Sequence, residues 1–104
     1  MFVTVATYRA KTGEEDAIIA LHEDWQRNLQ FWAKGYLSGE LLRSIGNSRE
    51  FIALMRFESQ EAAQLLVNDP KQNAWYRRLV SLMEDTPILF NYKSEWWFTS
   101  LHSQ

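Results

Sequence analysis

The sequence predicts an α+β domain in which two helices cover one face of a four-stranded antiparallel sheet. Three observations lead to this fold class. The chain has 104 residues, which allows one hydrophobic core, because a chain of this size buries only about two thirds of its unfolded surface. Segments rich in β-branched and aromatic residues alternate with segments of 3.6-residue apolar periodicity. Gly and Pro fall where these segments end.

The first strand is expected at residues 2–9, FVTVATYR, which contains no helix or strand breaker. Thr12 and Gly13 end this strand. The acidic residues 14–16 then favour the first turn of a helix, because negative charge there complements the helix dipole. Residues at steps of three and four form the apolar stripe of this helix: Ile18, Leu21, His22, Trp25, Leu29 and Trp32. Gly35 is expected to stop it.

A β-hairpin is expected next, with strand-like runs at 36–45 and 50–58 joined by the turn 46–49. Ser59 can cap a short helix, and Asp69-Pro70 is a second helix start, with a capping side chain followed by proline at the first helical position. The second helical piece carries its own apolar stripe, formed by Trp75, Leu79, Leu82 and Met83. A last strand is predicted over residues 88–98.

This element order predicts a ferredoxin-like split βαββαβ sandwich. One domain is expected at 1–98, followed by a polar C-terminal tail at 99–104. The strands carry apolar residues on both faces, yet the helices can cover only one. A large exposed apolar patch is typical of an association surface, so a homodimer with two sheets packed face to face is expected. Trp96 and Trp97, predicted to point to opposite faces of the last strand, are expected to contribute.

Charge and composition exclude several functional classes. The net charge is -2 and Lys and Arg are scattered, so neither nucleic acid nor a membrane is an expected partner. The chain has no cysteine, which removes disulfides, thiol nucleophiles and thiolate metal sites. Residues 1–15 lack the pattern of a signal peptide, and no apolar run approaches the roughly 20 residues of a membrane span. A cytoplasmic protein is expected.

The segment from Gly35 to Pro87 resembles the antibiotic biosynthesis monooxygenase (ABM) domain family, the dimeric α/β barrel proteins. The resemblance lies in the strand GYLSGELLRS, in the passage MRFESQEAA that leads from the third strand into a helix, and in the Trp and Pro of the segment after Asp69. It extends over residues 1–97. It implies a dimer and a cavity between sheet and helices that holds an aromatic or other flat organic molecule.

Some members of this family look like cofactor-free oxygenases that convert polycyclic phenols or quinols to quinones, and others cleave haem. The haem-cleaving branch uses an asparagine on the first strand, then a tryptophan and a histidine around the second helix. Matched by position, this chain has Thr7, Leu65 and Trp75. Because the haem ligand is missing, haem cleavage is not expected, and no cofactor is predicted.

His22 is the leading catalytic candidate. It lies on the inward stripe of the first predicted helix, which the resemblance places beside the cavity. Imidazole, with an ordinary pKa of about 6.5, could take a proton from a phenol and leave an anion able to pass an electron to O₂. The alternative is a hydrogen-bonded, inert histidine at the edge of the core. His102 lies in the polar tail, so a two-histidine metal site is not expected.

Two arginines and several aromatic residues are candidate ligand contacts. Arg43 and Arg56 share strand faces with apolar residues, so each guanidinium is expected to be partly buried and then to need an anionic or carbonyl partner. A bound phenolate, or a glutamate such as Glu40 or Glu95 across the dimer, could supply it. The remaining candidates could stack on a flat ligand or hydrogen-bond to it, or could instead belong to the core. They are Tyr8, Trp25, Trp32, Trp75 and Asn91.

Two functions follow from these observations. The first is an ABM-type cofactor-independent monooxygenase-like protein that acts on a small aromatic hydroxy compound, with His22 as the base. The second is a non-catalytic small-molecule-binding or accessory dimeric protein of the same fold. The second is motivated by the missing haem residues and by the lack of any paired acid and base.

Overall fold

The computed structural model describes residues 1–98. Four strands and three helices follow one another with a short 3₁₀ turn, η1: β1 Phe2–Arg9, α1 Glu15–Asn28, η1 Gln30–Trp32, β2 Tyr36–Arg43, β3 Glu50–Phe57, α2 Gln60–Val67, α3 Pro70–Ser81 and β4 Ile88–Lys93. The sheet has the order β2-β3-β1-β4, and every neighbouring pair is antiparallel. The predicted ferredoxin-like α+β fold is confirmed.

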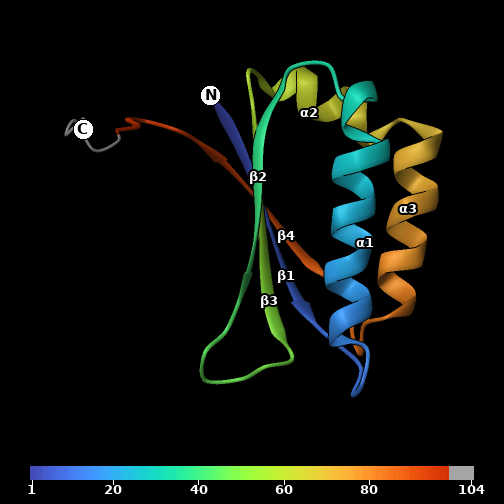
Figure 1. The fold of residues 1–104 in the computed structure, drawn as a ribbon. Helices are drawn as coiled ribbons and strands as arrows, with labels where there is room; N and C mark the ends of the chain where they lie inside the picture. Colours follow the sequence, from blue (N-terminus) through green and yellow to red (C-terminus); the bar gives the residue numbers. More distant parts are fainter. Residues whose placement is uncertain (99–104) are drawn as a thin grey trace, which may run out of the picture.

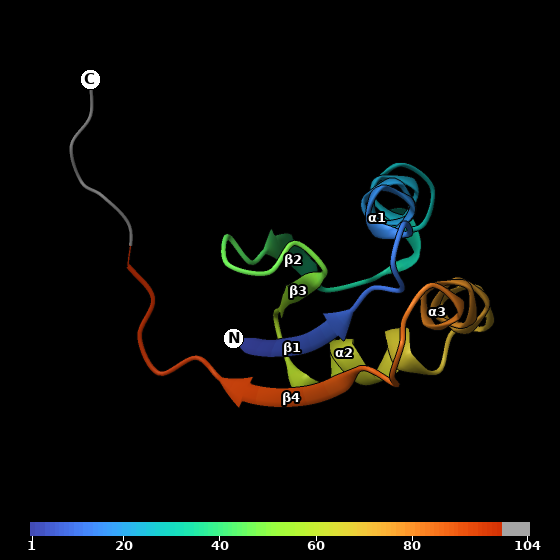
Figure 2. The same cartoon turned by 90° about the horizontal axis from the view of Figure 1, so that it is seen from below.

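All three helices lie on one face of the sheet, as Figure 1 shows edge-on and Figure 2 shows from below. The core lies between these two layers. Its largest fully buried side chains are Phe51, Phe57, Ile18 and Leu79. Side chains of a strand alternate between faces, so the residues of β1 and β3 that enter the core are every second one: Ala6, Tyr8, Phe51, Ala53 and Phe57.

Two helices begin at the predicted caps. The hydroxyl of Ser59 accepts a hydrogen bond from the backbone N–H of Ala62 at 3.1 Å. The carboxylate of Asp69 accepts one from the N–H of Lys71 at 2.7 Å, and Pro70 follows at the first helical position. Such caps satisfy N–H groups that have no partner inside the helix. They fix where the chain turns to lay α2 and α3 on the sheet.

The first helix is shorter than predicted, because α1 ends at Asn28 and the chain tightens into the 3₁₀ turn η1. Gly35 therefore does not stop the helix but forms the turn into β2. It has φ +77°, and a Cβ there would lie 2.6 Å from Cβ of Ala62. The N–H of Glu58 donates to the carbonyl of Gly35 at 2.8 Å. The helix ends early because the chain must reach this edge of the sheet.

The last strand is also shorter than predicted. β4 ends at Lys93, which pairs with Phe2 at the start of β1. Beyond this point β1 offers no strand residue for pairing, so Trp96 and Trp97 do not belong to the sheet, and their predicted alternation between its faces is wrong. Residues 94–98 leave the sheet on the side away from the helices (Figures 1 and 2). The predicted tail, including His102, lies outside the described residues.

The sheet face opposite the helices is apolar and uncovered in the single chain. The strand register places Leu42, Ile52, Thr7 and Ile88 in one row across all four strands. We call this surface, formed mainly by Val3, Val5, Thr7, Leu42, Ile52, Leu54, Ile88, Phe90 and Tyr92, the outer face. Arg56 also lies on it, beside Val3. Antiparallel sheets commonly present polar residues on an open face, so its composition is unusual. Among residues 1–98, no helix is both long and apolar enough to cross a bilayer.

Candidate functional site

A cavity of about 790 Å³ lies between the inner face of the sheet and the helices. This volume is in the range of small-molecule sites, which are commonly apolar with a few polar groups. Six of the predicted site residues line it: Tyr8, His22, Trp25, Arg43, Trp75 and Asn91. They come from β1, α1, β2, α3 and β4, so the fold brings together residues that are distant in the sequence.

His22 and Tyr8 are in contact on the wall of this cavity. Nδ1 of His22 lies 2.8 Å from the backbone carbonyl oxygen of Ile18, and Nε2 lies 3.3 Å from the Tyr8 hydroxyl. A carbonyl oxygen only accepts hydrogen bonds, so Nδ1 carries a proton. Burial lowers the pKa of His22, and the hydrogen bond to Ile18 opposes this shift only in part. The ring is therefore neutral at pH 7, and the Tyr8 hydroxyl donates to Nε2.

The Tyr8 hydroxyl stays protonated at neutral pH. Burial raises its pKa above the ordinary value, and the nearby Tyr76 adds a smaller increase. The Tyr8 and His22 rings have centroids 5.6 Å apart. The wall of the cavity thus carries a neutral phenol that donates to a neutral imidazole, and the charged form of each group is disfavoured by the same apolar surroundings.

Two tryptophans are held by hydrogen bonds that fix their orientation. Trp75 Nε1 donates to the carbonyl oxygen of Leu21 at 2.9 Å, and its ring is nearly perpendicular to that of His22, with centroids 5.1 Å apart. Trp25 Nε1 donates to Oε1 of Gln72 at 2.6 Å. Buried indole N–H groups require a partner, and these partners tie α1 to α3. The two rings are therefore rigid parts of the cavity wall.

Gln72 is a cavity residue that the sequence reasoning missed. It precedes Trp75 by three positions, so both lie on the same side of α3, and this helical spacing was the available signal. Tyr36 was also missed. Its ring packs against Trp25 with centroids 4.9 Å apart, although it lies on β2 and no local pattern relates the two.

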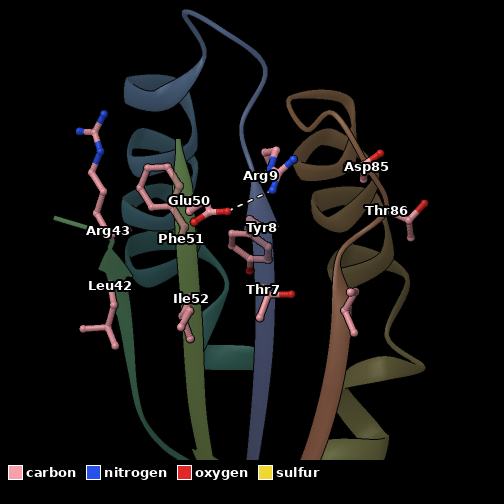
Figure 3. A pocket seen from close by; sticks show the side chains of 12 residues that line it. Thr7, Tyr8, Arg9, Leu42, Arg43, Glu50, Phe51, Ile52, Asp85 and Thr86 are labelled. Carbon is pink, nitrogen blue, oxygen red and sulfur yellow. Dashed lines mark hydrogen bonds and ion pairs between the residues drawn. The ribbon is translucent and has the colours of Figure 1, made fainter. Parts of the chain in front are cut away.

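Arg43 borders the cavity but is exposed, which differs from the partial burial predicted for it. Its Nε donates to the carbonyl oxygen of Ser48 at 2.7 Å, and its guanidinium lies 5.3 Å from the centre of the Phe51 ring. The hairpin turn therefore supplies a carbonyl partner, one of the two kinds that were expected. A second hollow of about 510 Å³ lies at this end of the sheet. Figure 3 shows the side chains that line it. It shares Tyr8, Arg43 and Phe51 with the cavity.

Two predicted contacts do not line the cavity. Arg56 points to the outer face, because it pairs with Val3 and alternates with the inward-facing Phe57. Trp32 lies in η1 rather than on the helical stripe, and 58% of its surface is exposed. The Lys71 ammonium lies over the Trp32 ring at 3.3 Å. The early end of α1 explains why Trp32 is displaced from the cavity.

The positions matched to haem cleavage are not brought together. Thr7 lies on the outer face and Leu65 is exposed on α2, while Trp75 lines the cavity. Within residues 1–98, no group of three or more His, Asp or Glu side chains is arranged to hold a metal ion.

The family model for antibiotic biosynthesis monooxygenase matches residues 1–78. The chain belongs to this family. The match covers β1 to most of α3, and therefore includes every cavity residue described above except Asn91. No curated protein sequence matches the chain.

Several solved structures, two of them named as antibiotic biosynthesis monooxygenases, are similar to this chain in fold. A candidate antibiotic biosynthesis monooxygenase from Deinococcus radiodurans has a TM-score of 0.80 and 14% identity, over 98% of this chain and 100% of that one. Another candidate monooxygenase, from Nitrosomonas europaea, has a TM-score of 0.79 and 14% identity, over 92% and 100%. A conserved protein from Methanosarcina mazei has a TM-score of 0.81 and 10% identity, over 90% and 92%.

Proposed function

We propose that this ABM-family protein is a cofactor-independent monooxygenase-like enzyme that acts on a small aromatic hydroxy compound, a quinol or a polycyclic phenol. Family membership and the cavity support this proposal. The cavity is mainly lined by apolar and aromatic side chains, and its fixed indole rings are suited to a flat substrate. A neutral imidazole at the wall supplies a base.

The chemistry starts with removal of the hydroxyl proton from the substrate. The resulting phenolate is electron-rich and transfers electrons to O₂, which then adds to the ring as a peroxide. Loss of water gives a carbonyl, so that one oxygen atom of O₂ enters the product as a quinone oxygen and the other leaves in water. The substrate supplies all electrons, and the protein supplies a base and mainly apolar walls that limit the water around the anion.

The observation that carries this proposal is the state of His22. Its Nδ1–H is held by the Ile18 carbonyl, so Nε2 is the basic nitrogen, and burial keeps the ring neutral at pH 7. A general base must be unprotonated at working pH and close to the proton that it removes. His22 meets the first condition, and its place on the cavity wall is consistent with the second.

Oxygen uptake tests the enzyme function. The protein is incubated under air with a panel of polycyclic phenols and quinols, and O₂ consumption and quinone formation are recorded. We expect His22→Ala to lower kcat by about 10²–10⁴-fold, the usual effect of losing a general base. His102→Ala, which changes the only other histidine, is the matched control and retains the wild-type rate. Equal traces for the wild type and His22→Ala across the panel would refute the proposal.

We also propose that two copies associate through the outer face. Members of this family are commonly dimeric. Five large side chains on the outer face, Leu42, Ile52, Ile88, Phe90 and Tyr92, are each between 40% and 58% exposed in the single chain. Because burial of apolar area contributes roughly 25 cal/mol per Å², a second copy is a favourable cover for them.

The second candidate function is a binding or accessory protein that holds an aromatic compound without turnover. The observation that favours it is that the lone pair of His22 Nε2 already accepts the Tyr8 hydroxyl. An inert histidine would have the same hydrogen bonds. Calorimetric binding of a phenol without oxygen uptake by any member of the panel would support this function over the enzyme.

A further inference from the structure

The Tyr8 hydroxyl occupies the one hydrogen-bond acceptor that His22 offers on the cavity wall. A neutral imidazole has one lone pair, and on His22 this lone pair is at Nε2, 3.3 Å from the Tyr8 oxygen. The other ring nitrogen is protonated and bonded to Ile18. A bound phenol therefore finds no free acceptor on His22 unless Tyr8 moves. The Tyr8 oxygen, in contrast, donates its proton and keeps lone pairs that can accept another.

We propose that Tyr8 takes the proton of the substrate hydroxyl while it passes its own proton to His22, so that the two side chains form a proton relay. This inference rests on the proposed function. It differs from direct deprotonation by His22 in making Tyr8 the catalytic residue that contacts the substrate oxygen. The substrate chemistry it selects is a phenolic hydroxyl directed toward β1.

Each bond that breaks in the relay is matched by a bond that forms. The substrate O–H bond breaks as a new O–H bond forms on Tyr8, and the original Tyr8 O–H bond breaks as an N–H bond forms on His22 Nε2. The result is a substrate phenolate, a neutral Tyr8 and an imidazolium that donates from both nitrogens. Because burial disfavours a free tyrosinate, the two transfers occur together. The Ile18 carbonyl stabilises the imidazolium.

Two further contacts hold the relay in place. Trp75 packs edge-on against the imidazole and is itself fixed by the Leu21 carbonyl. Tyr8 is only 7% exposed and is paired with Phe51 on β3, so its ring has little freedom. The other ionisable groups that line the cavity come from α1, β2 and α3: Glu23, Tyr36, Glu40, Arg43 and Tyr76.

The relay is tested with 4-nitrophenol, an acidic phenol whose ionised form absorbs in the visible. The probe is bound to the wild type at a pH where the free probe is protonated, and its absorbance is recorded with the ¹⁵N shifts of the His22 ring. We expect the wild type to ionise the bound probe and to show both His22 nitrogens protonated, because the negative charge of the bound phenolate favours the imidazolium that burial disfavours in the empty cavity. Tyr8→Phe and His22→Gln should each leave the probe protonated.

The matched control is Tyr92→Phe, which removes a phenol hydroxyl from the outer face and should ionise the probe as the wild type does. A Tyr8→Phe variant that binds and ionises the probe as well as the wild type would show direct transfer to His22 and overturn the relay. So would a wild type that fails to bind the probe or binds it without ionising it. If Tyr8→Phe does not fold, Tyr8→Leu takes its place, because it also removes the hydroxyl and leaves His22 unchanged.

Steady-state kinetics of the same variants distinguish a failure of the relay from a failure of the proposed enzyme function. With an active substrate, Tyr8→Phe and His22→Gln should each lower kcat by about 10²-fold or more with little change in KM, and the double variant should lose little further activity, because the two groups act as a unit. Ionisation of the probe without oxygen uptake from any panel member would reject the enzyme function and keep the relay. Oxygen uptake that survives in Tyr8→Phe would reject the relay and keep the enzyme.

Discussion

Ala6 and Ala53 face each other across β1 and β3, and both point toward the helices. Each is 9% exposed and has no side-chain atom beyond Cβ. Large residues surround them along the strands, since Tyr8 and Phe51 form the next inward-facing pair. This pair of alanines is therefore the part of the sheet where the cavity has room to extend down to the backbone.

A large side chain at the position of these alanines should weaken ligand binding. In Ala53→Phe the added ring occupies the cavity, and we expect the affinity for 2-naphthol, measured by calorimetry, to fall by at least about tenfold, or about 1.4 kcal/mol. Ala74→Phe, at an exposed position of α3, adds the same ring outside the cavity and is the control. Unchanged binding in Ala53→Phe would place the ligand elsewhere.

The pKa of His22 predicts a pH dependence of stability. The pKa of His22 is lower in the folded protein than in the unfolded chain. When the pH falls below about 6.5, His22 therefore binds a proton in the unfolded chain but not yet in the folded protein. The free energy of unfolding therefore falls as the pH drops from about 6.5 toward the folded pKa. His22→Gln should remove this part of the slope. Urea unfolding of both proteins at several pH values measures the difference, and parallel curves would contradict the assigned shift.

Gly35 should be more sensitive to substitution than Gly13. Both have positive φ, which costs other residues about 1–3 kcal/mol. At Gly35 an added Cβ would also meet Cβ of Ala62 at 2.6 Å, whereas at Gly13 nothing lies within 4 Å. We expect Gly35→Ala to lower the free energy of unfolding by more than Gly13→Ala. In Gly13→Ala only the unfavourable backbone conformation destabilises the protein. Equal losses would mean that the turn into β2 relaxes freely.

A charge on the outer face should weaken self-association. Phe90→Asp places a carboxylate in the proposed interface, where its desolvation costs several kcal/mol. The dissociation constant of the dimer should therefore increase by about a hundredfold or more. Leu65→Asp is the control, because Leu65 is 64% exposed but lies on α2. Sedimentation velocity at micromolar concentration compares the two. A wild type that sediments as a single chain would refute association through this face.

Local signals in the sequence predicted most of the fold. The strand at Phe2–Arg9 and the helix starts at Ser59 and Asp69 were predicted because capping and alternation depend on neighbouring residues alone. The ends of α1 and β4 were not, because each depends on a distant partner. α1 stops where the chain must turn at Gly35 into the edge strand β2, and β4 stops where β1 begins at Phe2.

The candidate site was predictable only in outline. Helical spacing placed His22 on the inner side of α1, and it likewise relates Gln72 to Trp75. The contact of His22 with Tyr8 depends on how α1 crosses β1, which no sequence spacing encodes. Arg43 was expected to need an anionic or carbonyl partner, but strand alternation does not indicate that the hairpin turn brings the Ser48 carbonyl to it.

The distribution of the five tryptophans gives the protein a built-in optical reporter. Trp25 and Trp75 are 5% and 6% exposed on the cavity wall, while Trp32, Trp96 and Trp97 are between 58% and 80% exposed. A water-borne quencher such as acrylamide will therefore extinguish the emission of the last three and spare the first two. The remaining fluorescence then comes from Trp25 and Trp75 on the cavity wall. Its change on addition of an aromatic ligand reports binding without a label.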